Sequence, residues 1–199
     1  MYTQQQAGNE ILNCLQLMGQ QQSNPVLEIL DLNETYLENK KYPQDKLLFK
    51  EDGWQAYYHS HSQPNKVGNE HGHFHIFHQC ERQRWTHLVA LSMDSQGQPL
   101  QWFTTNRWVT DECWQPATRL TEYIQKCSSN NEWLLTEKWL VAMLKLYEDE
   151  IVSLLQLRDK FIIDLEENIE VVDIHENRDY YILSKEMLNL KSKLIDVLH

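Results

Sequence analysis

The spacing of hydrophobic positions changes twice along the chain and divides it into three stretches. Over residues 1–40 apolar side chains such as Ile11 and Leu15 recur every three or four residues, which predicts N-terminal helices. Between residues 54 and 108 the pattern is strand-like, with alternating positions and many aromatic and β-branched residues. Over residues 110–199 the helical spacing returns, so this last stretch is expected to be mainly helical.

Four strand candidates lie in the middle stretch, joined by short connections rich in turn residues. Such connections are too short for the crossovers that parallel strands need, so we expect an antiparallel meander. The order of helices, meander and helices predicts a single α+β domain, residues 1–199, with the N- and C-terminal helices packed against the sheet. The predicted strands cover residues 54–61, 71–78, 85–93 and 100–108.

Local signals refine the helical stretches. Asn24 followed by proline is typical of a helix N-cap, so a second helix is expected up to about Asn39. A helix is expected from Thr110 to about residue 127, and a break is expected in the acidic run 148–150. Residues 171–174 favour a short strand, and Ser184 is placed to cap a final helix that ends near residue 197.

Composition limits the classes of protein that fit this layout. A chain of 199 residues that is 41% hydrophobic can bury a sizeable core, which excludes a disordered protein. The formal net charge of −11 disfavours nonspecific nucleic-acid binding, which requires Lys and Arg to neutralise phosphates. No apolar run approaches the roughly 18 residues that span a bilayer, and the N-terminus lacks the pattern of a secretory signal. We therefore expect a cytoplasmic protein without membrane contact.

Histidine is concentrated in one part of the chain. Seven of the nine histidines lie between residues 59 and 87, and three of them alternate in the run His71-Gly-His73-Phe-His75. Because successive side chains of a strand point to opposite faces, these three are expected to share one face. Three neighbouring imidazoles suit a ligand set better than a hydrophobic core.

A hairpin between the first two strands would bring two more histidines to this patch. If the hairpin is symmetric about residue 66, His59 faces His73 and His61 faces His71, with Cβ atoms roughly 4.5–5.5 Å apart. Glu70 would lie at the edge of the patch. A slip of one residue in this register would flip one strand and split the cluster.

This set of side chains predicts a metal centre. Zinc, iron, manganese and nickel are commonly held by two to four imidazole nitrogens, with or without one carboxylate. The leading hypothesis is a metal-dependent enzyme, a hydrolase or oxygenase, in which bound Zn²⁺ or Fe²⁺ activates water or a substrate oxygen and Glu70 and His73 take part in the chemistry. The expected metal ligands are His59, His61, His71, His73 and His75.

Two interpretations without a metal remain open: a histidine-lined pocket for an organic ligand, and polar neighbours with no joint role. His78 has the opposite parity to the triplet and is not expected to be a ligand. His87 shares the parity of the apolar residues Val89 and Leu91, which predicts a histidine satisfied within the core.

A second group of polar residues lies at the end of the fourth strand, over residues 102–108. The planar guanidinium of Arg107 suits bidentate binding of carboxylate or phosphate. We expect Arg107 to lie within reach of the histidine pocket and to anchor a small anionic substrate. The alternative is an ion pair with Asp111 or Glu112 that stabilises the start of a helix.

The alternating triplet is similar in spacing to the His-φ-His-φ-His-φ-φ strand of histidine-triad nucleotide hydrolases and transferases. This resemblance implies nucleotidyl or phosphoryl chemistry with His73 as the nucleophile. The match departs from that family at Gly72, where the family prefers a bulky apolar residue. It departs again in order, because two predicted strands and several helices follow this strand here.

Over roughly residues 50–160 the chain also resembles an uncharacterised bacterial domain family. The resemblance brings no function, but it implies that the histidine strand and the Thr-Asn-Arg-Trp segment belong to one unit. A non-enzymatic accessory protein, whose acidic helical C-terminal third binds a protein partner, is a further alternative. The resemblance rests on Tyr57-Tyr58-His59-Ser60-His61, Glu70-His71-Gly72-His73-Phe74-His75, Thr86-His87-Leu88-Val89-Ala90-Leu91 and Phe103-Thr104-Thr105-Asn106-Arg107-Trp108-Val109-Thr110.

Overall fold

The structure, a computed structural model, describes residues 2–30, 35–49, 53–61, 68–80, 84–168 and 173–199. Its strands are β1 (Tyr42–Phe49), β2 (Trp54–His59), β3 (Glu70–Gln79), β4 (Trp85–Asp94), β5 (Pro99–Thr105) and β6 (Ile182–Met187). Its helices are α1 (Gln4–Gln20), α2 (Arg107–Thr110), α3 (Ala117–Lys126), α4 (Leu135–Leu146), α5 (Glu148–Asn168) and α6 (Leu190–Leu198), with 3-10 turns η1 (Leu27–Ile29) and η3 (Ile174–Glu176).

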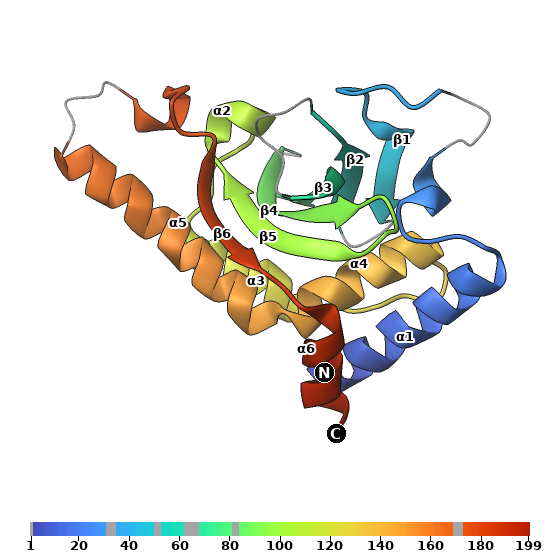
Figure 1. The fold of residues 1–199 in the computed structure, drawn as a ribbon. Helices are drawn as coiled ribbons and strands as arrows, with labels where there is room; N and C mark the ends of the chain where they lie inside the picture. The colour runs from blue at the N-terminus through green and yellow to red at the C-terminus, as the bar shows by residue number, and fades with distance from the viewer. Residues whose placement is uncertain (1, 31–34, 50–52, 62–67, 81–83, 169–172) are drawn as a thin grey trace.

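The six strands form one antiparallel sheet in the order β1-β2-β3-β4-β5-β6. Strands β1 to β5 form a meander, and β6 returns from the C-terminal part of the chain to pair with β5. The helices α1, α3, α4 and α5 lie beneath one face of this curved sheet (Figure 1). The expected α+β class and the helical packing are confirmed.

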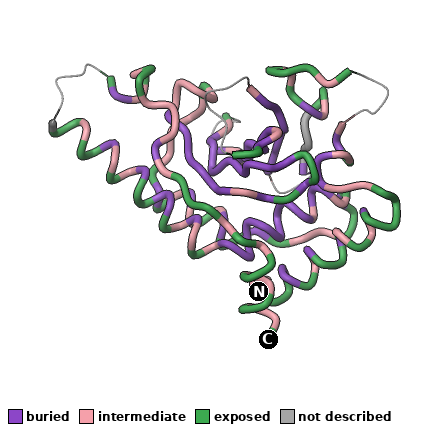
Figure 2. The backbone as a smooth tube through the Cα atoms, in the orientation of Figure 1, coloured by how far each residue is buried: buried purple, intermediate pink, exposed green. Residues whose placement is uncertain are grey.

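The core lies between this sheet face and the helices. Helix α4 is buried along nearly its whole length, and Trp139 at its centre contacts the ring of Phe74 in β3. Even-numbered residues of β2 and of the middle of β3 belong to the same core, namely Trp54, Ala56, Tyr58, Phe74 and Ile76. Figure 2 shows the buried backbone concentrated in the central strands and in the helix beneath them. The odd-numbered positions of β2, and those of β3 from His73 to Phe77, therefore face away from the helices.

Caps and turns shift two of the predicted boundaries, the end of a strand and the start of a helix. The strand expected to reach residue 108 ends at Thr105, because the Asn106 side chain accepts a hydrogen bond from the Arg107 amide and starts α2. The helix expected from Thr110 begins only at Ala117, after the short helix α2 ends in a left-handed residue at Asp111. The break expected at residues 148–150 lies one residue earlier, at Tyr147, because α4 ends at Leu146 and the acidic run forms the first turn of α5.

Other predicted elements were wrong in type or were missed. Ser184 does not cap a helix: it lies in β6, where its hydroxyl donates to the Leu154 carbonyl 2.8 Å away. Strand β1 was missed because it contains proline and then three consecutive polar residues, Gln44-Asp45-Lys46. Of the second helix only η1 is found, and residues 31–34 lie outside the described part of the chain. Residues 171 and 172 of the expected short strand also lie outside it.

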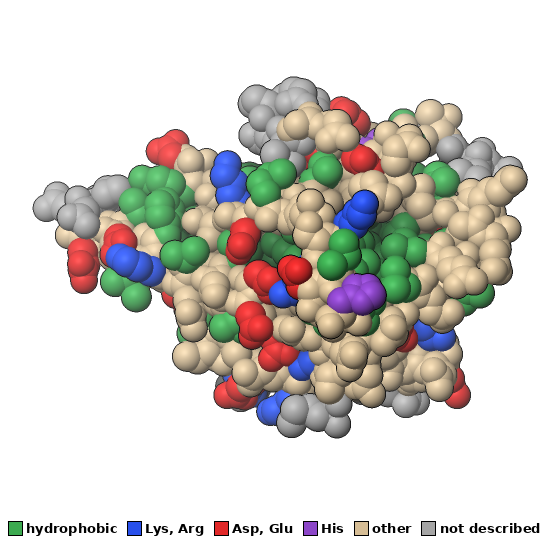
Figure 3. All heavy atoms as spheres, turned by 60° about the horizontal axis from the view of Figure 1, so that its bottom comes forward, with side chains coloured by type: hydrophobic (Ala, Val, Ile, Leu, Met, Phe, Trp, Pro, Cys, Tyr) green, Lys and Arg blue, Asp and Glu red, His purple; other side chains and the backbone are tan. Residues whose placement is uncertain are grey.

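The helical side of the molecule is turned toward the viewer in Figure 3, where acidic and basic side chains are scattered among hydrophobic ones. Within the described ranges, no helix has both the length and the apolar character that crossing a bilayer requires.

Candidate metal centre

The sheet face opposite the helices carries the histidines. In the ladder between β2 and β3, His59 pairs with His73 and Tyr57 pairs with His75. Directly paired residues point to the same face, so His59, His73 and His75 come together. The pairing of His59 with His73 that the symmetric hairpin predicts is confirmed.

Three imidazoles converge at this point. The Nε2 atoms of His59 and His73 lie 3.0 Å apart, and the ring of His75 lies 4.9 Å from each of the other two rings. One ring nitrogen from each histidine lies within 4.8 Å of the others, and all three residues are buried. Zinc–nitrogen bonds of about 2.0–2.1 Å in a tetrahedral site place ligand nitrogens roughly 3.3 Å apart, so small side-chain rotations would complete the set.

The outer nitrogens of two of these histidines are held by neighbouring side chains. His73 donates its Nδ1–H to the Glu70 carboxylate over 2.8 Å, between two side chains that are almost fully buried. His75 Nδ1 lies 2.9 Å from His87 Nε2, and His87 Nδ1 lies 3.3 Å from the Thr105 hydroxyl. Metal-binding histidines are usually oriented in this way by a partner on the other ring nitrogen.

Within the part of the chain that the structure describes, the remaining nitrogen of His75 has no hydrogen-bond partner. Its Nε2 is buried beside His59 and His73. Buried polar atoms without a partner are rare in folded proteins, because losing water without replacement costs free energy. A metal ion among the three rings would satisfy this nitrogen.

Two irregularities of the β3–β4 ladder place the supporting side chains on the histidine face. One lies between Glu70 and Gly72, and it brings the Glu70 side chain to His73. The other lies between the pairs Ile76–Val89 and Phe77–His87, and it brings His87 to the same face. The sequence parity that assigned His87 to the apolar core therefore fails at this point, although the residue is buried as expected.

His71 does not join the cluster, and the expectation that it shares a face with His73 is wrong. Its Nδ1 lies 2.8 Å from the Tyr58 hydroxyl, and its ring lies 4.8 Å from that of Tyr36. Tyr58 belongs to the core on the helical side. The irregularity beside Gly72 has broken the alternation that the prediction assumed.

His61 lies beside the cluster but its ring nitrogens have other partners. Its ring centroid is 4.4 Å from that of His59. Its Nδ1 lies 3.0 Å from the Asn39 side-chain oxygen, and its Nε2 lies 3.1 Å from the Tyr181 hydroxyl. As placed, His61 closes one side of the cluster.

Burial favours the neutral form of His59, His75 and His87, because it lowers the pKa of each. It lowers the pKa of His59 to about 2, with neighbouring His73 adding to the effect. Burial likewise lowers the pKa of His87 to about 3 and that of His75 well below its ordinary value. Neutral imidazoles retain the lone pair that a metal ion requires.

Arg107 lies at the surface and is paired with acids that the sequence argument did not consider. Its Nη2 is 2.7 Å from Glu176 and 3.1 Å from Asp173, both near η3. Neither Asp111 nor Glu112, the partners expected from the sequence, forms this pair. Arg107 also lines a cavity beside the cluster, and its role in anion binding stays a prediction.

The chain belongs to a protein family whose model, described as a domain of unknown function (DUF6969), matches residues 5–188. This match covers the sheet, the histidine cluster and most of the helices. No match was found among curated proteins or among solved structures.

Proposed function

We propose that this member of the DUF6969 family binds one divalent transition-metal ion through His59, His73 and His75. The single observation that carries the proposal is the buried, unpartnered Nε2 of His75 beside the Nε2 atoms of the other two. Three imidazole ligands suit zinc, iron, nickel or copper, and zinc is the ion that we expect.

The hydrogen bonds around the rings are compatible with metal binding. His73 donates from Nδ1 to Glu70, which leaves its Nε2 lone pair free. A neutral His75 that donates from Nδ1 to His87 Nε2 likewise presents a free Nε2. His87 then carries its proton on Nδ1 and donates it to the Thr105 hydroxyl. This tautomer assignment is the one that metal binding selects.

Three protein ligands leave a fourth position open, which is the arrangement of catalytic rather than structural zinc sites. A metal ion held in this way supplies a Lewis acid or an activated water. We therefore propose a metal-dependent enzyme that acts on a small anionic substrate. Here Glu70 orients His73.

The first experiment is elemental analysis of protein purified without a histidine tag, followed by calorimetric titration of the EDTA-treated protein with Zn²⁺. We expect one zinc per chain, and an affinity more than tenfold lower in His75→Ala. His78→Ala is the matched control, because His78 lies on the same strand but stacks on Tyr123 on the helical side. No zinc binding, or equal affinity in the two variants, would overturn the proposal.

The metal-free alternative is phosphoryl or nucleotidyl chemistry on His73, for which the Glu70–His73 pair would orient the imidazole. In this structure His73 Nε2 is directed at His59 Nε2 and the residue is only 3% exposed. Nucleotide hydrolysis by EDTA-treated protein that is lost in His73→Ala but kept in His75→Ala would favour this alternative over the metal centre.

A further inference from the structure

A cavity of about 550 Å³ lies beside the histidine cluster, within the range of small-molecule sites. Tyr57 and Phe77 form part of its wall, and their rings stack 5.5 Å apart. The Tyr57 ring lies 5.4 Å from the ring of His59 and 5.3 Å from that of His75. The cavity and the metal centre therefore share an aromatic wall.

Cationic side chains surround this cavity although the chain as a whole carries a net charge of −11. Arg107 is already held by two carboxylates, and Lys41 Nζ lies 4.3 Å from the centre of the Tyr57 ring. Arg84 is exposed and forms no ion pair with any residue that the structure describes. Arg84 is thus the guanidinium best placed to meet an incoming anion.

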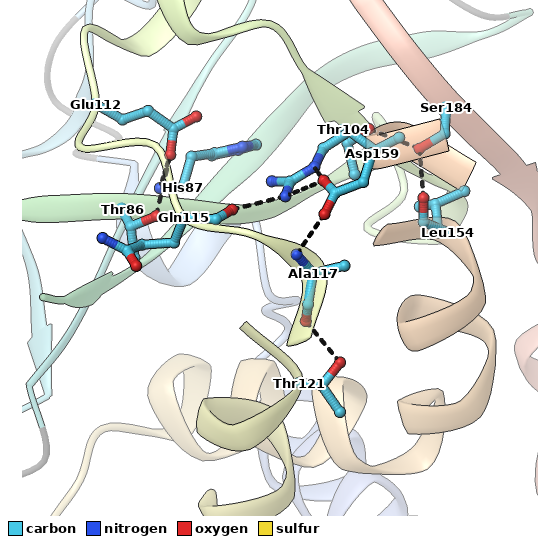
Figure 4. Close-up of polar contacts among 11 residues, drawn as sticks. Thr86, His87, Thr104, Glu112, Gln115, Ala117, Thr121, Leu154, Asp159 and Ser184 are labelled. Atoms are coloured by element: carbon cyan, nitrogen blue, oxygen red, sulfur yellow. Dashed lines mark hydrogen bonds and ion pairs between the residues drawn. The ribbon is translucent and has the colours of Figure 1, made fainter. Parts of the chain in front are cut away.

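The cavity wall contains two acidic residues, and burial favours the neutral form of one of them, Glu112. The Glu112 carboxyl accepts hydrogen bonds from the Thr86 hydroxyl, 3.3 Å away, and from the His87 amide (Figure 4). Burial raises the pKa of Glu112 to about 8, although nearby Arg158 and these two hydrogen bonds favour the charged form. At neutral pH Glu112 therefore does little to cancel the cations, and Asp111 is the other acid of the wall.

We propose that this cavity binds a small planar carboxylic acid, aromatic or conjugated, with its carboxylate at Arg84 and its planar part against Tyr57, Phe77 and Trp85. A guanidinium binds a carboxylate through two parallel hydrogen bonds, and aromatic side chains stack on planar groups. The role of this acid as a substrate rests on the proposed metal centre, but its binding does not.

Benzoate is the probe, added to EDTA-treated protein and followed by the fluorescence of tryptophan, since Trp85 lines the cavity. We expect saturable binding of benzoate, and binding at least tenfold weaker for benzamide, its neutral analogue, and for inorganic phosphate. Arg84→Gln should weaken benzoate binding about tenfold. Arg119→Gln, on the exposed side of α3 and outside the cavity wall, should leave it unchanged. Absence of benzoate binding, equal binding of benzamide, or equal affinity in the two variants would overturn the proposal.

A second measurement separates this proposal from the metal centre. In protein loaded with Co²⁺, the proton relaxation of bound benzoate should be enhanced, and the enhancement should disappear in His75→Ala. If Co²⁺ does not bind but benzoate does, the metal centre fails and the cavity site stands. If Co²⁺ binds and benzoate does not, the cavity site fails alone.

Discussion

The metal-free protein should be most stable near pH 6.5, and Glu112 should cause the loss of stability on the alkaline side. Burial raises the pKa of Glu112 to about 8, from 4.5 for the exposed group. Between these two values the unfolded chain has lost a proton that the folded chain keeps, so the free energy of unfolding falls as pH rises. The slope for one group is about 1.4 kcal/mol per pH unit, which gives about 2 kcal/mol between pH 6.5 and pH 8.

Below pH 6.5 the buried histidines lower the free energy of unfolding as the pH falls, which is opposite to the effect of Glu112. Burial lowers the pKa of His59 to about 2 and of His87 to about 3, so in acid the unfolded chain binds protons that the folded chain does not. The stability that they contribute is present above pH 6.5 and is lost as the pH falls. Between pH 6.5 and pH 5 the two histidines together remove about 3 kcal/mol, of which Glu112 offsets about 2 kcal/mol. His75 adds to the loss in the same direction.

Urea unfolding of EDTA-treated protein at about pH 5, 6.5 and 8 tests this reasoning. Glu112→Gln should abolish the alkaline fall and steepen the acid fall, because the amide does not titrate. Glu132→Gln, an exposed residue before α4, should give a curve parallel to that of the wild type. A Glu112→Gln curve that also runs parallel to that of the wild type would show that the buried carboxyl does not hold its proton.

Three further predictions concern the histidine face and its surroundings. Glu70→Gln should weaken zinc binding about 10- to 100-fold in calorimetric titration without unfolding the apo-protein, because only the charge that orients His73 is removed. Unchanged zinc affinity would show that Glu70 does not orient His73 for metal binding. Gly72→Ala should lower the free energy of unfolding by about 1–3 kcal/mol, because the new methyl carbon would lie 2.5 Å from the His59 carbonyl oxygen. Gly19→Ala is the control, because the space around Gly19 is open and the change should not destabilise the protein. Equal urea midpoints for the two variants would contradict this. Arg107→Lys should change benzoate affinity less than twofold, because Arg107 is occupied by two carboxylates; a loss as large as that of Arg84→Gln would make Arg107 an anchor.

The arrangement that follows from regular alternation could be predicted from the sequence. The meander, the pairing of His59 with His73 and the convergence of both with His75 need only strands of period two and a symmetric turn. The place of Arg107 could not be predicted in the same way, because its ion pairs depend on tertiary structure. Its carboxylate partners lie 66 and 69 residues further along the chain, and no local pattern joins them to it.

Two bulges, which interrupt the regular alternation of the strands, bring hydrogen-bond partners to the histidines of the cluster. Had β3 been regular, Glu70 would lie on the helical side, away from His73, and the bulge beside Gly72 reverses that. In β4 a second bulge moves His87 from the apolar face to His75. Bulges insert single residues that sequence periodicity does not reveal, so the ligands could be foreseen and their hydrogen-bond partners could not. The two bulges place Glu70 at Nδ1 of His73 and His87 at Nδ1 of His75. Removing either partner should lower the metal affinity although all three ligands remain.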